Sequence, residues 1–478
     1  MIRVACTAFV LASFFFAAGV RSEEIVKSSG ADQSAVSLTV YNSNVGLVRE
    51  VRRLTLPSGT GELRFMDVPS GIIPETVLAH SLTSADSFKV LEQNYEYDLI
   101  NRRRLLDKYV GRRLKIVPFD QAQGKGDPVA ATLISNNDGE IYDINGEIFL
   151  GHPGVAVLPD IPDNLIAKPT LMWLFANETR EPQDIEVAYM TNNITWRADY
   201  VLSLDKEDRL GDLAGWVTIN NQSGAAYTDA RLKLVAGTLN RVQENPRSNM
   251  EKMRAVAFDA ELAGSGFQEE SFFEYHLYDL QRKTTVKDRQ IKQISLLEGK
   301  GVPLRKEFII DNAQSWWFWQ AYSEQEENKP VKVVVSFRNS AADRLGMPLP
   351  EGIIRLYKQD SAGGAQFVGE DRIKHTPKDE EVRIKVGEAF DVVSQRRQVN
   401  FQRISNRTIE TSWEIRIRNH KKEDIVVQVI EPIAGYADWQ IPQAAYPYTK
   451  VNAANIRFEV PVSRDGEAIL TYTAQVTR

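Results

Sequence analysis

The stretch TSWEIRIRNHKKEDIVVQVIEP, residues 411–432, decides the fold class of this chain. In its first half, Ile415 and Ile417 alternate with charged residues, so that one face is apolar and the other is charged. This period of two is typical of a half-buried β-strand. The charged run at 420–424 predicts a turn, and residues 425–432 predict the second arm of a hairpin. The segment therefore indicates antiparallel β structure.

The last residues of the chain repeat this pattern. Two alternating apolar runs, at 456–462 and 468–476, are separated by Asp465 and Gly466. An Asp-Gly pair between alternating runs is a strong signal for a hairpin. The longest apolar stretches after the N-terminus, such as residues 331–337, have the length of a strand. We therefore expect a mostly β fold, in which a small barrel-like N-terminal module is followed by one or two antiparallel β-sandwiches.

The barrel-like module is predicted at about 98–159. A short helix covers residues 98 to about 110 and ends at Gly111, which suits the left-handed capping position. Short strands follow, joined by Asp-Gly and Asn-Gly turns at 138–139 and 145–146; their sequences are RLKIVPF, VAATLIS, EIYDI and EIFLG. Five short elements with tight turns indicate a small barrel of the SH3 or the oligonucleotide-binding kind. The periodicity is compatible with both kinds.

The N-terminus has the three parts of a secretory signal peptide. Arg3 precedes an apolar core at residues 4–20, and small residues lead to Ser22 and an acidic pair. The core is shorter than the ~20 residues that a membrane-spanning helix needs, which favours cleavage over anchoring. We expect cleavage after Ser22, with a cut after Gly19 as the alternative, and export of the remaining chain.

The composition limits the chemistry of the exported chain. The single cysteine, Cys6, lies in the leader, so the rest has no disulfide, thiolate metal ligand or cysteine nucleophile. A secreted chain without disulfides leans towards a bacterial origin. Without Arg3 and Arg21 of the leader, 56 basic and 64 acidic residues remain. This ordinary charge does not suggest nucleic acid as a partner, and no later segment has transmembrane length.

The pattern along the chain predicts its division into parts. Residues 244–271 lose the alternation and run through Gly264 and Gly266, which predicts a mobile insertion between β segments. The expected parts are a signal peptide at 1–22, a flexible lead-in at 23–36, an N-terminal β region at 37–167 that contains the module, a first β-sandwich part at 168–340, and a C-terminal β-sandwich part at 341–478.

No residue pattern in the sequence points to a catalytic, cofactor-binding or metal site. The histidines are not spaced as metal ligands; they are His80, His152, His276, His375 and His420. The chain also has no nucleophile elbow, Ser-x-x-Lys, phosphate-binding loop or dinucleotide glycine motif. Because a triad can assemble across a fold, this does not exclude an enzyme. We name no catalytic, metal or cofactor-binding residue and expect no cofactor.

Two polar segments allow both a functional and a structural interpretation. NNDGEIYDINGE, residues 136–147, is rich in calcium ligands, but neither glycine places acids at both ends of an EF-hand loop. Two hairpin turns explain it better. INRRRLLDKYVGRR, residues 100–113, holds six basic residues and one acid. It is suited to anionic envelope polymers or phospholipid headgroups, but we favour a solvated helix whose Leu99, Leu106 and Val110 pack inward.

An aromatic run is the most unusual local feature. Trp316, Trp317, Phe318 and Trp319 are consecutive, and Tyr322 follows. On a strand, alternate rings face opposite sides, so one side must belong to the core. The other side is either covered by a neighbouring domain or forms a platform for a sugar or a partner. We favour burial on both sides.

Several long segments resemble the family called domain of unknown function 4139. They are TNNITWRADYVL (191–202), GWVTINNQSG (215–224), ARLKLVAGTLNRV (230–242), FFEYHLYDLQRKTTVKDRQIKQISLL (272–297), VGEAFDVV (386–393) and RNHKKEDIVVQVIEP (418–432). Weaker similarity reaches VYNSNVGLVREVR (40–52) and LLDKYVG (105–111). The resemblance implies an exported all-β protein with a variable stretch at 244–271. Distant relatives labelled mucoidy inhibitors imply a link to envelope polysaccharide. The family pattern supplies no catalytic residue.

These observations favour an exported, non-enzymatic protein of the periplasm or the bacterial exterior, with a binding or structural role in the envelope. Envelope polysaccharide or another envelope protein is the expected partner. The alternative is a hydrolase of envelope polysaccharide or peptide, with carboxylates on separate loops. A deep pocket with two carboxyl groups about 5–10 Å apart would favour the hydrolase, and a flat surface or open sheet edge would favour binding.

Overall fold

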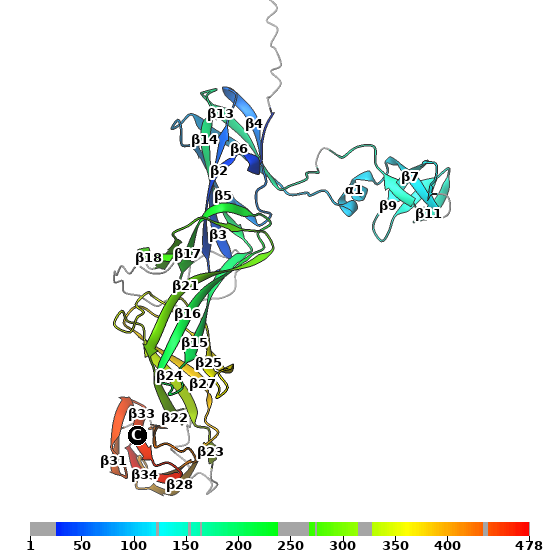
Figure 1. Ribbon diagram of the computed structural model, residues 1–478. Helices are drawn as coiled ribbons and strands as arrows, with labels where there is room; N and C mark the ends of the chain where they lie inside the picture. Colours follow the sequence, from blue (N-terminus) through cyan, green and yellow to red (C-terminus); the bar gives the residue numbers. More distant parts are fainter. Residues whose placement is uncertain are drawn as a thin grey trace, which may run out of the picture. The chain divides into compact units, whose positions relative to one another are not determined.

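The computed structural model describes residues 25–477, except for 121–123, 152–153, 163–164, 238–266, 273–274, 314–326 and 434–437. Strands dominate this part of the chain (Figure 1), and only one α-helix and one 3-10 turn accompany them among the described residues. The predicted mostly β class is therefore confirmed. None of the described helices is long and apolar enough to cross a membrane.

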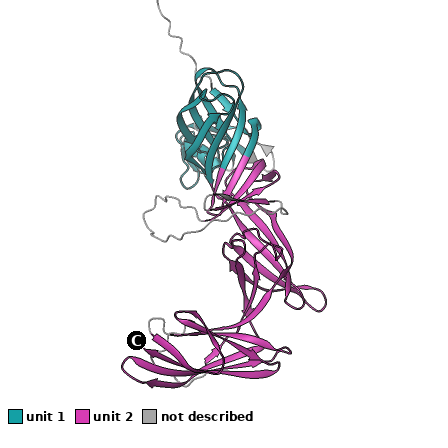
Figure 2. Cartoon of the chain, turned by 90° about the vertical axis from the view of Figure 1, so that its left-hand side faces the viewer, with its two compact units in different colours: residues 1–36, 48–191 teal, residues 37–47, 192–478 magenta. Residues whose placement is uncertain are grey.

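The chain divides into two compact units (Figure 2). Unit 1 contains residues 1–36 and 48–191, and unit 2 contains residues 37–47 and 192–478. The borders between the units therefore fall after Val36, after Leu47 and after Thr191. The borders predicted at 167 and 340 stay predictions. The hairpin of residues 33–54 enters both units, because residues 37–47 belong to unit 2 and its remaining residues to unit 1.

A four-stranded sheet belongs to unit 1. In spatial order its strands are β1 (Ile25–Ser28), β4 (Gly59–Met66), β13 (Thr170–Asn177) and β6 (Phe88–Glu96). Strand β1 lies in the segment that the sequence predicts to be flexible, but it pairs in parallel with β4. The following 3-10 turn η1 (Gly30–Asp32) is closed by a capping box between Ser29 and Asp32. Backbone pairing and this cap order a segment whose polar composition alone indicates a loop.

A second sheet has eight strands, which the unit border divides. Its spatial order is β18 (Phe267–Phe272), β19 (Tyr275–Leu280), β17 (Tyr227–Ala236), β2 (Gln33–Tyr41), β3 (Val45–Leu54), β14 (Gln183–Asn192) and β5 (Ile72–Ser81), with β20 (Thr284–Val286) attached to β17. The predicted mobile insertion at 244–271 lies mostly outside the described residues, and its last residues belong to β18.

The predicted module forms a sheet of its own. Its spatial order is β11 (Glu147–Leu150), β10 (Ile141–Ile144), β9 (Val129–Ser135), β7 (Arg113–Asp120) and β12 (Gly154–Val157), with β8 (Gly124–Lys125) attached to β7. Four strands form a meander and the last lies beside the first, which agrees better with the SH3-like alternative than with a Greek-key oligonucleotide barrel. The described sheet is not closed, since β11 and β12 are its two edges.

The helix of the module, α1 (Arg102–Tyr109), is shorter than predicted. Asn101 is its N-cap and accepts the Arg104 backbone N–H at 3.0 Å. Gly111 has φ +80°, so the predicted left-handed position is confirmed. Leu106 packs inward as expected, but Val110 does not: the helix ends before it, and Tyr109 takes the inward place. The two turns predicted at 138–139 and 145–146 are also present.

A five-stranded sheet occupies the middle of unit 2. Its spatial order is β21 (Gln290–Pro303), β16 (Leu210–Asn221), β15 (Ile194–Leu204), β25 (Gly352–Gln359) and β26 (Ala365–Ile373). The pairs are antiparallel except for β15 and β25, which run in parallel. Every second residue of β15 is buried over most of its length, so this long strand places one face of the sheet against the core.

The C-terminal part is a sandwich of two sheets. The first contains β27 (Glu381–Glu388), β24 (Lys332–Arg338), β22 (Arg305–Asp311), β30 (Ile425–Pro432), β33 (Asn455–Val462) and β32 (Tyr448–Asn452). The second contains β23 (Glu327–Lys329), β28 (Val392–Arg403), β29 (Thr408–Asn419), β34 (Gly466–Thr477) and β31 (Asp438–Ala444). Apolar side chains from both sheets share one core, as Ile415, Ile417, Val427 and Val429 illustrate.

Both hairpins predicted in this part are wrong, although all four strands are present. Strand β29 pairs with β28 and β34, whereas β30 pairs with β22 and β33. The turns at 420–424 and 463–465 therefore cross from one sheet to the other. Alternation of apolar and polar residues shows that a strand has one buried face. The same alternation is expected for the two arms of a hairpin and for two strands that face each other across a core, so it does not distinguish them.

Four buried asparagines close equivalent turns along the chain. Each lies at or just after the end of a strand, and each side-chain amide donates to two or three backbone carbonyls across the following turn; they are Asn177, Asn221, Asn339 and Asn419. Asn419 donates to Glu423, Val462 and Ser463, so one side chain holds both crossings of the C-terminal sandwich. Buried polar groups need such partners.

Candidate binding site

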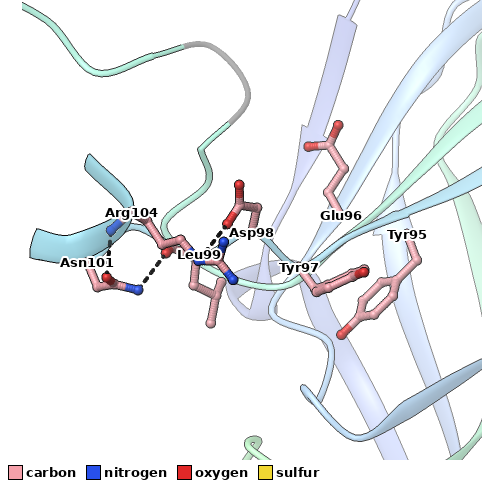
Figure 3. A pocket seen from close by; sticks show the side chains of 7 residues that line it. All are labelled: Tyr95, Glu96, Tyr97, Asp98, Leu99, Asn101 and Arg104. Carbon is pink, nitrogen blue, oxygen red and sulfur yellow. Dashed lines mark hydrogen bonds and ion pairs between the residues drawn. The ribbon is translucent and has the colours of Figure 1, made fainter. Parts of the chain in front are cut away.

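A hollow of about 530 Å³ lies where the four-stranded sheet leads into α1 (Figure 3). Its lining residues come from the end of β6 and from the start of the helix; they are Tyr95, Glu96, Tyr97, Asp98, Leu99, Asn101 and Arg104. The backbone below it is fixed by Ile166, which pairs with Leu99 in a parallel bridge and donates to the Asp98 carbonyl at 3.2 Å. The hollow therefore has an ordered floor.

Two stacked tyrosines form one side of this hollow. The rings of Tyr95 and Tyr97 have centroids 5.5 Å apart and an interplanar angle of 28° (Figure 3). Tyr97 is 71% exposed, whereas the Tyr95 hydroxyl donates to the Ser70 carbonyl at 3.3 Å. Burial and the neighbouring Tyr97 raise the pKa of Tyr95 above its usual value, so its hydroxyl stays protonated at neutral pH.

Charged groups form the opposite side. The Arg104 guanidinium lies 3.5 Å from the Asp98 carboxylate, and Lys108 lies 4.0 Å from the same carboxylate. The Arg104 side chain remains 59% exposed. An aromatic surface beside exposed hydrogen-bonding groups can hold a polar ring, which stacks on one side and bonds at its edge. The arrangement supplies binding groups, and it contains neither a histidine nor a serine nucleophile.

Sequence reasoning found part of this site. The basic segment 100–113 contains Arg104, which faces the hollow, but the tyrosines were missed. Their signal is the spacing: Tyr95 and Tyr97 are two apart at the end of a strand, so they share a face. Of the other cations of α1, Lys108 lies 4.0 Å from Asp98, and Arg102 pairs with Glu140 at 2.9 Å.

A second hollow, of about 480 Å³, lies on the C-terminal sandwich. Its lining residues come from the end of β21 and the start of β22, from β24 and the turn after it, and from the start of β27 and the segment before it; they are Pro303, Leu304, Arg305, Ser336, Phe337, Arg338, Asp343, Asp379, Glu380 and Glu381. The carboxylate of Asp343 accepts the Ser340 hydroxyl at 2.6 Å, and the Arg338 guanidinium donates to the Asp379 carbonyl. The two groups are thus used to hold the turns around the hollow.

The histidines of the described residues lie apart from both hollows. His80 is exposed on β5, 3.8 Å from Glu186. His276 contacts Glu269 at 2.7 Å on neighbouring strands, and His375 accepts the Glu351 backbone N–H at 3.1 Å. His420 follows β29, and His152 lies outside the described residues. Among the described residues, no group of three His, Cys, Asp or Glu side chains is placed to hold a metal ion.

The aromatic run of Trp316, Trp317, Phe318 and Trp319, with Tyr322, also lies outside the described residues. Its two interpretations, a filled core and a platform, therefore stay predictions.

Two clusters of the described chain, one in each unit, contain an ion pair in which both side chains are buried. The N-terminal cluster consists of Glu50 and Arg52, which are 2% and 1% exposed, with Phe65, Tyr189 and Gln33 around them. The C-terminal cluster consists of Arg396 and Glu431, which are 4% and 0% exposed, with Trp413, Tyr472 and Asn312 around them. In both, the guanidinium lies 3.5 Å above an aromatic ring and a tyrosine donates to the carboxylate.

A third polar group runs across the middle sheet of unit 2. Asp199 accepts the Thr218 hydroxyl at 2.7 Å and pairs with Arg197 at 3.1 Å and Arg355 at 3.3 Å. Arg355 continues to Glu370 at 3.1 Å. Burial acts to raise the pKa of Asp199, but Thr218 and the two arginines hold this pKa below its usual value. The carboxylate is therefore ionised and occupied by its neighbours at neutral pH.

The family model described as Domain of unknown function (DUF4139) matches residues 185–476, which is more than half of the chain. No curated protein matches the sequence. The matched region begins in β14 and ends in β34, so it contains the C-terminal cluster and three of the four buried asparagines. The chain therefore belongs to the DUF4139 family, as its sequence motifs predict.

Proposed function

We propose that this chain is an exported, non-enzymatic protein that has a binding or structural role in a bacterial envelope. The observation that carries the proposal is that the buried ionisable groups are bonded to other residues of the chain. Glu50, Arg52, Arg396, Glu431 and Asp199 each contact two or more partners within and between sheets. A general acid or base must reach a substrate atom, and these groups are held away from solvent.

The hollow beside α1 is the proposed binding site. Its paired tyrosines suit a polar ring and its exposed Arg104 suits an anionic group, so a polysaccharide of the envelope fits this chemistry. Another envelope protein is the second kind of partner. Export and an envelope location are supported by the leader at 1–22, which has the parts of a signal peptide.

Location is tested by cell fractionation with N-terminal sequencing. We expect a chain that begins at Glu23 in the periplasmic or extracellular fraction. A chain that keeps its leader, or that is recovered only from detergent-solubilised inner membrane, contradicts the proposal.

Binding is tested by crosslinking in the native envelope, followed by pull-down and identification of glycans and proteins. The variants to compare are Tyr97→Ala, which removes a ring of the hollow at 71% exposure, and Tyr448→Ala, which removes a ring at 40% exposure on the C-terminal sandwich. We expect only Tyr97→Ala to lower the yield. Equal yields from both variants argue against the hollow.

The hydrolase alternative is tested on purified envelope polysaccharide and peptidoglycan. Release of reducing ends or free amines by the chain, with loss of release in Asp379→Asn together with Glu381→Gln, would replace the binding proposal with a catalytic one at the second hollow. We expect no release above the buffer control.

A further inference from the structure

The sheet of the module has two faces with different surroundings. Alternate side chains of its strands point towards α1 and form a small core; they include Leu114, Ile116, Ala131, Leu133, Tyr142 and Ile144. The intervening side chains point the other way, to what we call the outer face. In a soluble sheet with one buried face, these positions are normally polar.

The outer face of this sheet is instead largely aliphatic. Its exposed large side chains are Ile134 at 43%, Ile148 at 60%, Leu150 at 83%, Val155 at 62% and Val157 at 43%. Single exposed aliphatic residues are common on soluble proteins, but a set that shares one face of a five-stranded sheet is not.

Strand register places these residues in continuous groups. Leu150 on β11 is opposite Ile141 on β10. Ile141 is in turn opposite Ser135 on β9, next to Ile134, at a shift in the register. At the other edge, Val155 on β12 is opposite Val117 and Val157 is opposite Lys115. The two groups therefore lie on the same face, at its two edges.

Two cations lie between these groups. Arg113 and Lys115 point outward from β7, because Leu114 and Ile116 point to the core. Both are exposed, and neither has an ion-pair partner among the described residues. The acid of this face, Asp143, is used by its own turn, where it accepts the Gly146 N–H at 2.8 Å. The face thus combines aliphatic and positively charged groups.

We propose that the outer face docks on the surface of a bilayer that contains anionic phospholipid. Aliphatic side chains enter the boundary between headgroups and acyl chains, while Arg113 and Lys115 attract the phosphates. A symmetric contact between two copies would bring the cations of both together. The inference extends the proposed function by naming a lipid surface as a partner.

The test is co-sedimentation of the full chain from Glu23 onward with vesicles, because the apolar leader would itself bind lipid. Vesicles of phosphatidylethanolamine with phosphatidylglycerol are compared with vesicles of phosphatidylcholine. We expect preferential binding to the anionic vesicles that weakens with salt. Ile148→Ser with Leu150→Ser should lower the partition coefficient at least tenfold, and Arg113→Gln with Lys115→Gln about fivefold or more at low salt.

Matched controls change equal groups elsewhere. Leu78→Ser with Ile291→Ser removes two aliphatic side chains of 69% and 68% exposure, and Arg53→Gln with Lys89→Gln removes two exposed cations. Both should leave binding unchanged. Equal losses of vesicle binding in the test and control variants overturn the proposal. A dimer of the unchanged protein in sedimentation velocity that only Ile148→Ser with Leu150→Ser abolishes also overturns it, because the outer face would then bind a second copy. Because vesicle binding is measured outside the cell, its failure leaves the proposed export and envelope role untouched.

Discussion

The two clusters of buried charge use the same parts in different connections. In the N-terminal cluster, Glu50 and Arg52 are two residues apart on β3, so both charges come from one strand. In the C-terminal cluster, Arg396 lies on β28 and Glu431 on β30, which belong to opposite sheets of the sandwich. The first ion pair is local, and the second joins two sheets.

The hydrogen bonds of the two arginines also differ between the clusters. Arg396 donates from two nitrogens to both oxygens of Glu431, at 2.8–3.2 Å. Arg52 donates from two nitrogens to one oxygen of Glu50, at 3.2 and 3.1 Å, and also to the carbonyl and hydroxyl of Ser28. If its carboxylate is removed, Arg52 keeps the carbonyl and the hydroxyl of Ser28 as acceptors, whereas the partner that Arg396 keeps is the neutral hydroxyl of Tyr472. The C-terminal cluster should therefore depend more strongly on its acid.

The largest expected effect follows from this difference. Glu431→Gln leaves the Arg396 cation buried without its counter-charge, and we expect a loss of about 3–5 kcal/mol in the stability of unit 2. Glu50→Gln should cost unit 1 only about 1–3 kcal/mol. Hydrogen exchange followed by mass spectrometry at increasing denaturant measures the opening free energy of each unit in the intact chain.

The double variant Arg396→Leu with Glu431→Leu is the control for this pair. Replacing both buried charges with apolar groups should recover most of the loss, because no uncompensated charge remains. Equal losses of unfolding free energy from Glu431→Gln and Glu50→Gln would show that an ion pair between two sheets stabilises the fold no more than one within a strand.

The buried asparagines should give the next largest effect. Asn419→Ala leaves the carbonyls of Glu423, Val462 and Ser463 without the side-chain amide, and we expect a loss of about 2–3 kcal/mol in unit 2. Asn177→Ala should have a similar effect in unit 1, where the amide holds the carbonyls of Leu56 and Pro57. The exposed Asn406→Ala is the control, and the same exchange measurement applies. A loss of amide protection in unit 1 for Asn419→Ala, or in unit 2 for Asn177→Ala, would contradict the division into these two units.

Much of the fold can be predicted from the sequence because local patterns define it. The alternation around Ile415, the cap at Gly111 and the turn at Asn145 each depend on a few neighbouring residues, and all are present. The predicted strand partners in the C-terminal part were wrong, because the alternation of β29 and β30 indicates a buried face and not the strand beside it. Sheet crossings at 420–424 therefore looked like hairpin turns.

The charge clusters could not be predicted for a different reason. On β3 the inward positions are Val48, Glu50, Arg52 and Leu54, so two charged residues occupy positions where the alternation predicts apolar side chains. On β28 they are Val392, Ser394, Arg396 and Gln398, and almost no apolar alternation remains. Partners distant in the sequence, such as Tyr189 and Tyr472, make this burial possible. The local signal of the N-terminal cluster is a pair of charges two residues apart among the inward positions of one strand, Glu50 and Arg52 on β3.

The tyrosines of the clusters allow a smaller test. Tyr472→Phe removes the hydroxyl that donates to Glu431 at 2.7 Å, and we expect a loss of about 1–2 kcal/mol at pH 7. Burial and the Glu431 charge raise the pKa of Tyr472 well above its usual value of 10.0. Above pH 10 the unfolded chain therefore loses this proton while the folded chain keeps it, so stability falls as pH rises.

The phenylalanine variant cannot lose that proton, so its disadvantage should shrink as the pH rises from 10 to 11. Unfolding by denaturant at several pH values, followed in unit 2, checks this. A disadvantage that stays constant or grows above pH 10 would mean that Tyr472 ionises in the folded chain.

The smallest effect is expected at the hollow beside α1, which lies outside both clusters. Tyr97 is 71% exposed, so Tyr97→Ala removes its stacking on Tyr95 and little else. We expect a change within about 0.5–1 kcal/mol in unit 1, well below that of Glu50→Gln. Hydrogen exchange at β6 and around Glu50 measures both variants in the same way. A side chain that serves binding should be dispensable for stability, so a loss as large as that of Glu50→Gln would make the tyrosine pair a structural element and remove the hollow as a binding site.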